Sequence, residues 1–247
     1  MAKVHGNKSK YLVKEEKKAR WLFLLFFFLF VVSSLIYLPL SFIYRGNNWM
    51  SLLILIVFWS VGILLAVFAN KKKNQVINNF KGRKAEYNIF YELLKLPSNY
   101  HLLQSLKIYE KGNIDFVVVG PTGIFAIEVK SQGGVIGFDG MQLTRNGEGF
   151  EKDFLQQTLS GYKKIRTILE EKLNEEYFII PVLVFANKFA KIRFGFNKQR
   201  KVYVIGKKFL RRVISEHGYR EKSTDKEIQA VVDVLKNFQE SELELVK

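Results

Sequence analysis

The chain has 247 residues, no cysteine and a formal net charge of +16. The lack of cysteine excludes disulfide bonds and metal sites built from thiolates. This length allows one domain and an appendage, and the apolar residues are spread so unevenly that the two can be told apart.

Two uncharged segments rich in Phe, Leu, Ile and Val occupy residues 21–44 and 49–70. Each reaches the length of about 20 apolar residues that a helix needs to cross the hydrocarbon core of a bilayer. The four residues between them allow only a tight hairpin of antiparallel helices. A second apolar segment so close behind the first is not typical of a cleaved signal peptide. We therefore predict an N-terminal transmembrane helical hairpin.

Basic residues flank both predicted spans. Seven Lys or Arg residues and two Glu residues precede the first span, and three lysines directly follow the second. Since an excess of Lys and Arg marks the cytoplasmic side, both termini should be cytoplasmic, in a multi-pass protein of the cytoplasmic membrane. The predicted parts are a basic tail (1–20), the two spans (21–70), a basic linker (71–81) and a soluble domain (82–247).

Apolar periodicity and turn residues predict the elements of the soluble domain. The predicted helices are residues 82–96, 153–173, 207–216 and 225–238. The predicted strands are residues 102–109, 113–119, 124–130, 178–186 and 202–205, with a short peripheral pair within 135–144. Residues 178–186 form a continuous apolar run, which is typical of a strand buried on both faces. This order predicts an α/β domain.

Two of these strands are joined by Gly120-Pro-Thr-Gly123, a turn sequence that predicts a β-hairpin. If residue 120 faces residue 123, counting outward places Asp115 directly opposite Glu128. Two carboxylates about 5 Å apart repel each other and destabilise a sheet. The strand period of two places Lys130 on the same face as Glu128. A divalent metal site with an adjacent cation explains this pattern.

Three parts of the sequence together resemble the nuclease-related domain family (NERD), a branch of the PD-(D/E)xK nuclease superfamily. They are Gly82-Arg-Lys-Ala-Glu86, the stretch from Gly112 to Lys130, and a helix that carries Gln157. The resemblance extends over residues 80–185. It implies a restriction-endonuclease-like fold in which helices flank a mixed sheet.

The resemblance also implies roles for individual residues. Asp115 and Glu128 would bind Mg²⁺ or Mn²⁺, Glu86 would complete the metal shell, and Lys130 would lie by the scissile phosphate. Apart from the family, phosphodiester hydrolysis needs an activated water and stabilised negative charge, which bound Mg²⁺ supplies. Mg²⁺ prefers carboxylate and water oxygens, and Lys130 could offset the developing charge.

The glutamine of the predicted catalytic set is left open by the sequence. Family members carry Asn-Pro-x-x-Gln at the start of the second helix, whereas this chain has Lys-Asp-Phe-Leu-Gln-Gln at residues 152–157. The role could fall to Gln156 or Gln157. Gln157 is preferred because Ile165 and Ile168 follow on its face of the helix.

A basic stretch follows the last long apolar strand. Between Glu176 and Glu216 there are ten Lys or Arg residues and no acidic residue, with Phe189, Phe194 and Phe196 among them. Such a surface is suited to a phosphate backbone and to stacked bases. Anionic lipid at the bilayer is the alternative partner. The predicted nucleic-acid-binding residues are Lys188, Lys191, Arg193, Lys198, Arg200 and Lys201.

These features predict a membrane-anchored, Mg²⁺-dependent nuclease. Its substrate would be nucleic acid, with DNA expected and RNA left open. The alternative is a non-catalytic module that holds nucleic acid or another partner at the membrane. A transporter is disfavoured because neither apolar segment contains an ionisable residue.

Overall fold

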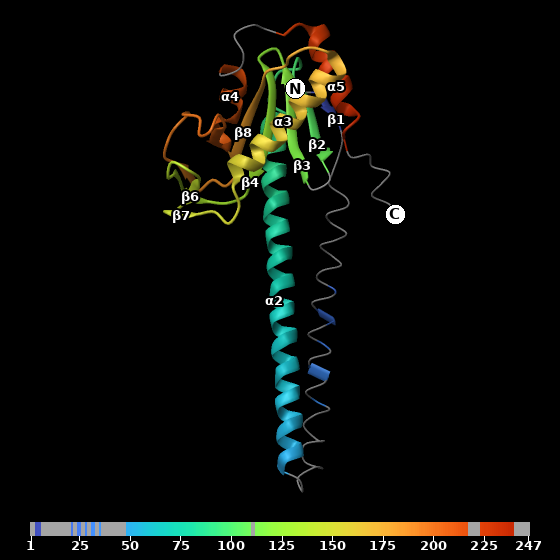
Figure 1. Cartoon of the computed structure of the whole chain (residues 1–247), viewed down its shortest axis with the longest axis vertical. Helices are drawn as coiled ribbons and strands as arrows, with labels where there is room; N and C mark the ends of the chain where they lie inside the picture. Colours follow the sequence, from blue (N-terminus) through green and yellow to red (C-terminus); the bar gives the residue numbers. More distant parts are fainter. Residues whose placement is uncertain are drawn as a thin grey trace. The chain divides into compact units, whose positions relative to one another are not determined.

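The computed structural model describes residues 3–5, 48–109, 112–216 and 223–239, with residues 21, 24, 25, 28, 31, 32 and 35 (Figure 1). The chain divides into two compact units. One unit is Ser9–Lys81, and the other combines Met1–Lys8 with Gly82–Lys247. Most of the predicted first span and most of the predicted basic tail lie outside the described residues.

Helix α2 runs from Asn48 to Leu93. It replaces the predicted linker at 71–81 and the predicted helix start at Gly82. Residues 71–81 contain neither proline nor glycine. Gly82, which follows, costs a helix only about 1 kcal/mol, so nothing here ends the helix. Within the part of the chain that the structure describes, no helix combines the length and the apolar character needed to cross a membrane. The predicted transmembrane hairpin thus stays a prediction.

A six-stranded mixed sheet forms the centre of the unit that contains residues 82–247, in the order β1-β2-β3-β4-β8-β10. β2, β3 and β4 pair antiparallel, whereas β1 with β2, β4 with β8, and β8 with β10 pair parallel. The strands are β1 (Lys3–His5), β2 (His101–Tyr109), β3 (Gly112–Gly120), β4 (Gly123–Lys130), β8 (Ile179–Phe185) and β10 (Tyr203–Gly206).

Strand β1 was not predicted, and it lies within residues 1–20, the predicted basic tail. Lys3 pairs with His101 and His5 with Leu103 at the edge of the sheet. A run of three residues is too short to produce a recognisable alternation of apolar and polar side chains. The N-terminus thus contributes to the folded domain.

The β3–β4 hairpin has the predicted register. Gly120 pairs with Gly123, and Phe116 pairs with Ile127. Glycine is required at position 120 because a Cβ there would lie 2.2 Å from Cδ1 of Tyr100. The turn sequence therefore fixes which residues meet further along the hairpin.

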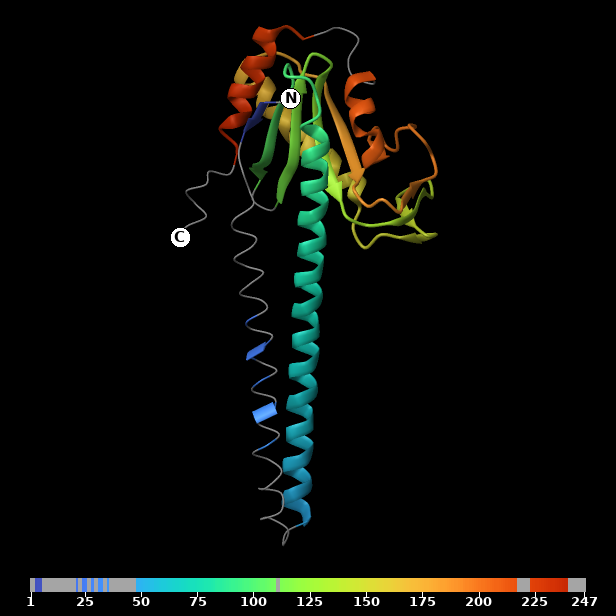
Figure 2. The ribbon, with the colours of Figure 1, turned by 180° about the vertical axis from the view of Figure 1, so that it is seen from behind.

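Helices cover both faces of the sheet (Figures 1 and 2). On one face lie α3 (Phe154–Leu173) and α5 (Asp225–Lys236), which contribute Ile165 and Val232 to the core there. On the other face lie residues 82–93 of α2, the short η1 (Lys207–Phe209) and α4 (Leu210–Glu216). The mixed α/β architecture of the prediction is confirmed.

Strand β4 serves both layers of the core. Ile124 and Ala126 pack in the α3–α5 layer, whereas Phe125 and Ile127 pack in the layer of α2 and α4. Because side chains alternate along a strand, Glu128 continues the first series. Its carboxylate therefore lies on the face that α3 covers.

A second sheet of four short strands has the order β7-β6-β5-β9. Its strands are β5 (Gly134–Phe138), β6 (Leu143–Arg145), β7 (Glu148–Gly149) and β9 (Ala190–Ile192). β5 and β6 form the predicted peripheral pair. β7 and β9 were not predicted, since each is two or three residues long. β9 follows β8 closely and brings part of the basic stretch to the edge of this sheet.

Candidate functional site

Glu128 is a buried acidic residue near the end of β4, and its exposed fraction is 7%. Two polar side chains contact its carboxylate. Lys130 Nζ lies 2.8 Å from Oε1, and Gln157 Nε2 donates to the same oxygen at 2.6 Å. Lys130 comes from β4 and Gln157 from the first turn of α3, so the contacts join the hairpin to the helix.

Lys130 and Gln157 also contact each other. Lys130 Nζ donates to Gln157 Oε1 at 2.9 Å, which closes a triangle of three side chains. An ammonium group can only donate and an ionised carboxylate can only accept. The orientation of the Gln157 amide is therefore set, with its oxygen toward Lys130 and its nitrogen toward Glu128. The Lys130 ammonium also lies 4.4 Å from the centre of the Phe154 ring.

Asp115 lies next to this triangle on β3. Backbone pairing of β3 with β4 extends to Phe116 and Ile127, and one step further Asp115 comes opposite Glu128. There the Val129 N–H donates to Asp115 Oδ2 at 2.8 Å. The side chain of Asp115 thus continues the link between the two strands, and its carboxylate is held beside that of Glu128.

The ionisation of Glu128 reflects these neighbours. Burial and then the charge of Asp115 raise the pKa of Glu128 from its ordinary 4.5 to about 7, although Lys130 opposes the shift. Glu86 on α2 adds a smaller repulsion in the same direction. At neutral pH the site therefore holds a carboxylate that is poised between its charged and neutral forms.

The predicted metal set of Asp115, Glu128 and Glu86 stays a prediction. Across the described ranges, no three His, Cys, Asp or Glu side chains gather in a way that could hold a metal ion. Glu86 influences Glu128 electrostatically from α2, whose buried residue Ala85 packs in the other core layer. Asp115 and Glu128 remain as the two candidate ligands, and both are carboxylates of the kind that Mg²⁺ prefers.

The start of α3 explains which glutamine enters the site. Asp153 caps the helix, and its side chain accepts a hydrogen bond from the Gln156 N–H at 2.9 Å. The exposed Gln156 side chain turns to Arg200, whose Nη2 donates to Oε1 at 3.0 Å. Gln157, one position later and half-buried, is the residue that contacts Glu128 and Lys130.

Arg200 has an intramolecular role that the sequence did not indicate. Its Nη1 lies 2.6 Å from Asp153 Oδ2, so it holds the cap of the helix that carries Gln157. Arg200 and Lys201 both have left-handed backbone conformations, with φ of 48° and 70°, which residues other than glycine rarely adopt. Reciprocal hydrogen bonds between Gln199 and Val202 close this turn. The guanidinium predicted to bind nucleic acid is thus already engaged.

The other predicted nucleic-acid-binding residues remain at the surface. Lys188 lies over the Phe189 ring and Lys198 over the Tyr203 ring, at 4.8 and 4.5 Å from the ring centres. In the described part of the chain, Lys191, Arg193 and Lys201 are exposed and form no ion pair.

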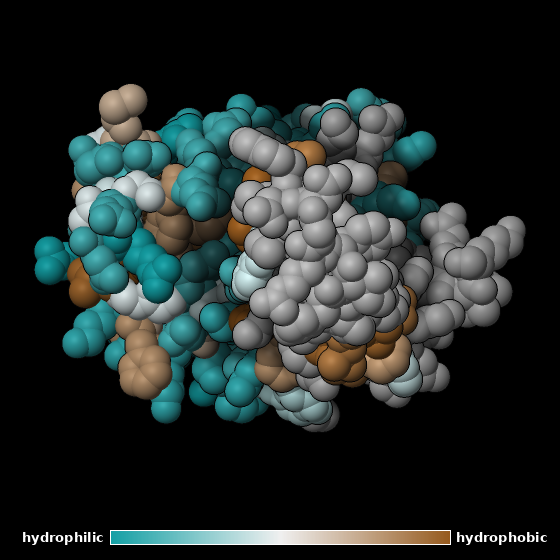
Figure 3. Space-filling model, turned by 90° about the horizontal axis from the view of Figure 1, so that it is seen from below, coloured by the Kyte–Doolittle hydropathy of each residue, from teal (hydrophilic) through white to brown (hydrophobic). Residues whose placement is uncertain are grey.

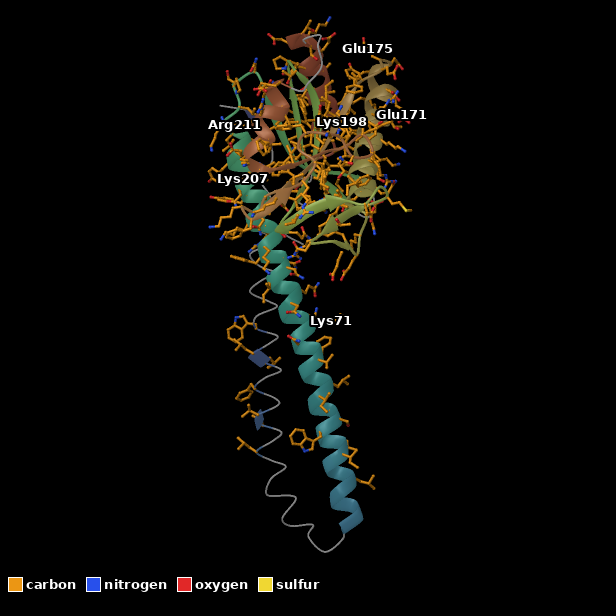
Figure 4. All side chains as sticks on the ribbon, turned by 90° about the vertical axis from the view of Figure 1, so that its left-hand side faces the viewer. Lys71, Glu171, Glu175, Lys198, Lys207 and Arg211 are labelled. Carbon is orange, nitrogen blue, oxygen red and sulfur yellow. The ribbon has the colours of Figure 1, made fainter. Side chains whose placement is uncertain are left out.

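Figure 4 shows Lys207 and Arg211 on the side of α4, and Glu171 and Glu175 around the end of α3.

Comparison with protein families matches the part of the chain that contains this site. Residues 81–186 match the family described as Nuclease-related domain (NERD). The match covers less than half of the chain, and it includes the hairpin with Asp115, Glu128 and Lys130 as well as Gln157. The chain thus contains a nuclease-related domain. Searches of the curated proteins and of the solved structures found no match.

The raised pKa of Glu128 predicts a pH-dependent stability. The Glu128 carboxyl group keeps its proton up to about pH 7 in the folded state, but only up to about pH 4.5 in the unfolded chain. Its contribution to the free energy of unfolding therefore falls as the pH rises from about 4.5 to about 7. Glu128→Gln carries no titrating group there. In metal-free buffer, its melting temperature should exceed that of the wild type at pH 8, and the difference should shrink toward pH 5.

Thermal unfolding of the full chain at both pH values measures this difference. Glu171→Gln, on the exposed surface of α3, is the control and should follow the wild type. A Glu128→Gln variant whose melting temperature stays parallel to that of the wild type would contradict the assignment.

Proposed function

We propose that the domain hydrolyses phosphodiester bonds of nucleic acid with the help of a divalent cation, Mg²⁺ or Mn²⁺. The observation that carries this proposal is the cluster of Glu128, Lys130 and Gln157 beside Asp115. It lies within the residues that match the nuclease-related domain. Two repelling carboxylates next to a fixed ammonium group do not benefit a sheet, but they suit a cation and a phosphate.

The residues fit the proposed cation. Mg²⁺ is commonly bound through one or two carboxylates while it keeps several water molecules, so Asp115 and Glu128 suffice without a third acidic residue. When bound, the cation would supply an activated water and stabilise negative charge. A positive charge near Glu128 would also favour its ionised form, because it would offset the burial and the Asp115 charge that raise the pKa of Glu128.

Lys130 would act on the phosphate itself. Glu128, Gln157 and the Phe154 ring surround its ammonium group, so the charge is held in one place before substrate binds. Preorganised charge stabilises a transition state more effectively than a mobile side chain does. Gln157 would keep Lys130 and Glu128 in their relative positions through its two ends.

The exposed members of the basic stretch would bind the nucleic-acid backbone. Lys188, Lys191, Arg193, Lys198 and Lys201 lie at the surface, and their contacts with phosphates would make the affinity depend on salt. Arg200 is better assigned to the support of α3. DNA is the expected substrate.

A cleavage assay tests the proposed reaction. The full chain in detergent is incubated with labelled single- and double-stranded DNA and RNA, with Mg²⁺ or with chelator. Lys130→Ala should lose Mg²⁺-dependent cleavage by at least about a hundredfold, the lower range for one electrostatic donor. Its affinity for nucleic acid should stay within a few-fold, because one contact among many is lost. Lys163→Ala, on the exposed surface of α3, should cleave normally.

One outcome of the assay favours the non-catalytic alternative. A wild-type chain that binds nucleic acid with steep salt dependence, yet cleaves none of these substrates with either metal, would be a binding module tethered by its N-terminal part.

The second part of the proposal is that residues 21–44 and 49–70 anchor the protein in the cytoplasmic membrane. Support comes from the lack of charge in both segments and from the surface of α2. The large apolar side chains of α2 that the structure describes between Leu53 and Phe68 are exposed by 46–69%. Hydrophobic surface is also visible on the face shown in Figure 3. The exposed side chains include adjacent positions such as Ile63 and Leu64, which point in different directions. Apolar side chains that are exposed in more than one direction are suited to contact with lipid.

Reporter fusions test the anchoring. A reporter at either terminus should be active only in the cytoplasm, because the lysines at 71–73 and those before residue 21 favour that side, and the protein should resist extraction from membranes by high salt. Recovery of the intact chain in the soluble fraction would contradict this part of the proposal and would leave the nuclease part unaffected.

A further inference from the structure

Phe189 exposes an aromatic ring on the segment that follows β8, the strand that pairs with β4 at Lys130. Its exposed fraction is 67%. The two other phenylalanines of the basic stretch are partly buried, Phe194 against the core beneath the small sheet and Phe196 against the core of α2 and α4. Among these three aromatic residues, Phe189 alone presents most of its ring to solvent.

The chain connects Phe189 tightly to the site. Lys130 pairs with Phe185 across β4 and β8, and the Ala186 N–H donates to the Lys130 carbonyl at 2.9 Å. Further along, the Gly134 N–H donates to the Phe189 carbonyl at 3.2 Å. Phe189 follows Phe185 by four positions, so its Cα atom lies at most about 13 Å along the strand direction from the row of Lys130.

A rigid turn holds the ring outward. The Phe189 N–H donates to Asn187 Oδ1 at 3.0 Å, and the Ala190 N–H donates to the Asn187 carbonyl at 3.0 Å. The Asn187 side chain in turn donates to the Ser131 carbonyl at 3.2 Å. With its backbone fixed in this way, Phe189 presents its ring to solvent beside the Lys188 ammonium, which lies over the ring.

Basic residues continue from Phe189 along β9, an edge strand of the small sheet. Lys191 and Arg193 are exposed like Phe189, whereas Ala190 and Ile192 between them pack toward the core. Side chains two positions apart on a strand share a face and lie about 7 Å from one another. β9 is only three residues long, but hydrogen bonds to the neighbouring β5 continue at both of its ends, from the Gly134 N–H to the Phe189 carbonyl and from the Arg193 N–H to the Ile136 carbonyl. Phe189, Lys191 and Arg193 thus form one outward row, and we call these three residues the β9 row.

We propose that the β9 row binds an unpaired nucleic-acid strand, with a base stacked on Phe189 and phosphates at Lys191 and Arg193. This inference rests on the proposed function and adds the class of substrate, which is nucleic acid with a single-stranded segment beside the cleavage site. Aromatic rings stack on any exposed base, and basic side chains follow the backbone. The bases of an intact duplex are stacked on each other and offer no free face.

Binding without cleavage tests the proposal. The full chain in detergent with chelator is titrated into a labelled single-stranded oligonucleotide and into a hairpin duplex, and fluorescence anisotropy gives both affinities. Phe189→Ala should weaken single-strand binding roughly 5- to 150-fold, the range for one stacked base, and duplex binding less than twofold. Phe189→Trp should retain wild-type affinity.

Phe178→Ala is the matched control, because Phe178 is 55% exposed and lies just before the start of β8, at the other end of this strand. It should bind like the wild type. Unchanged single-strand affinity in Phe189→Ala, or equal losses for single strand and duplex, would overturn the proposal. The proposal would also be overturned if Phe189→Ala lost affinity for vesicles of anionic lipid while it bound both oligonucleotides like the wild type.

The test separates this proposal from the proposed reaction. If the wild type cleaves nucleic acid with Mg²⁺ but Phe189→Ala binds normally, the stacking role fails and the nuclease stands. If the Phe189 effect is present but no substrate is cleaved, the β9 row stands as a binding surface and the catalytic proposal fails.

Discussion

The carboxylate of Glu128 lies where water has little access, and the rest of the site is arranged around that constraint. Removing an ionised carboxylate from water costs on the order of several kcal/mol unless partners compensate for it. Lys130 and Gln157 both contact its Oε1, yet the opposed Asp115 raises its pKa again. The domain thus keeps an unfavourable pair of carboxylates in its own sheet, which is the arrangement expected where function and stability conflict.

Support for this arrangement comes from elements far apart in the sequence. Gln157 can contact Glu128 and Lys130 only if the first turn of α3 stays in place. Asp153 caps that turn, and Arg200 in turn forms an ion pair with Asp153. Arg200 belongs to a turn with two left-handed residues, and such strain persists only where the surrounding structure maintains it. One end of this chain of contacts is the buried carboxylate, and the other is the basic surface that precedes β10.

The sequence was most informative where local chemistry determines the geometry. The turn at Gly120–Gly123 predicted the hairpin register, and the register placed Asp115 beside Glu128. The β9 strand and the Arg200 contact could not be predicted, since each depends on residues distant in the chain. The place of Glu86 depended on the packing of α2, which no local pattern encodes. Residues 71–81, which we predicted as a linker, are helical in α2, because polar composition does not by itself end a helix.

The most direct test of this account is the effect of Mg²⁺ on the thermal stability of the full chain at pH 8. A ligand that binds only the folded state stabilises it, by about 1.4 kcal/mol at ten times its dissociation constant. Saturating Mg²⁺ should raise the melting temperature of the wild type by a few degrees. Asp115→Asn should be as stable as the wild type or more so without metal, because it removes a repulsion, and should not respond to Mg²⁺. Equal shifts in both proteins would show that these two carboxylates do not form the cation site.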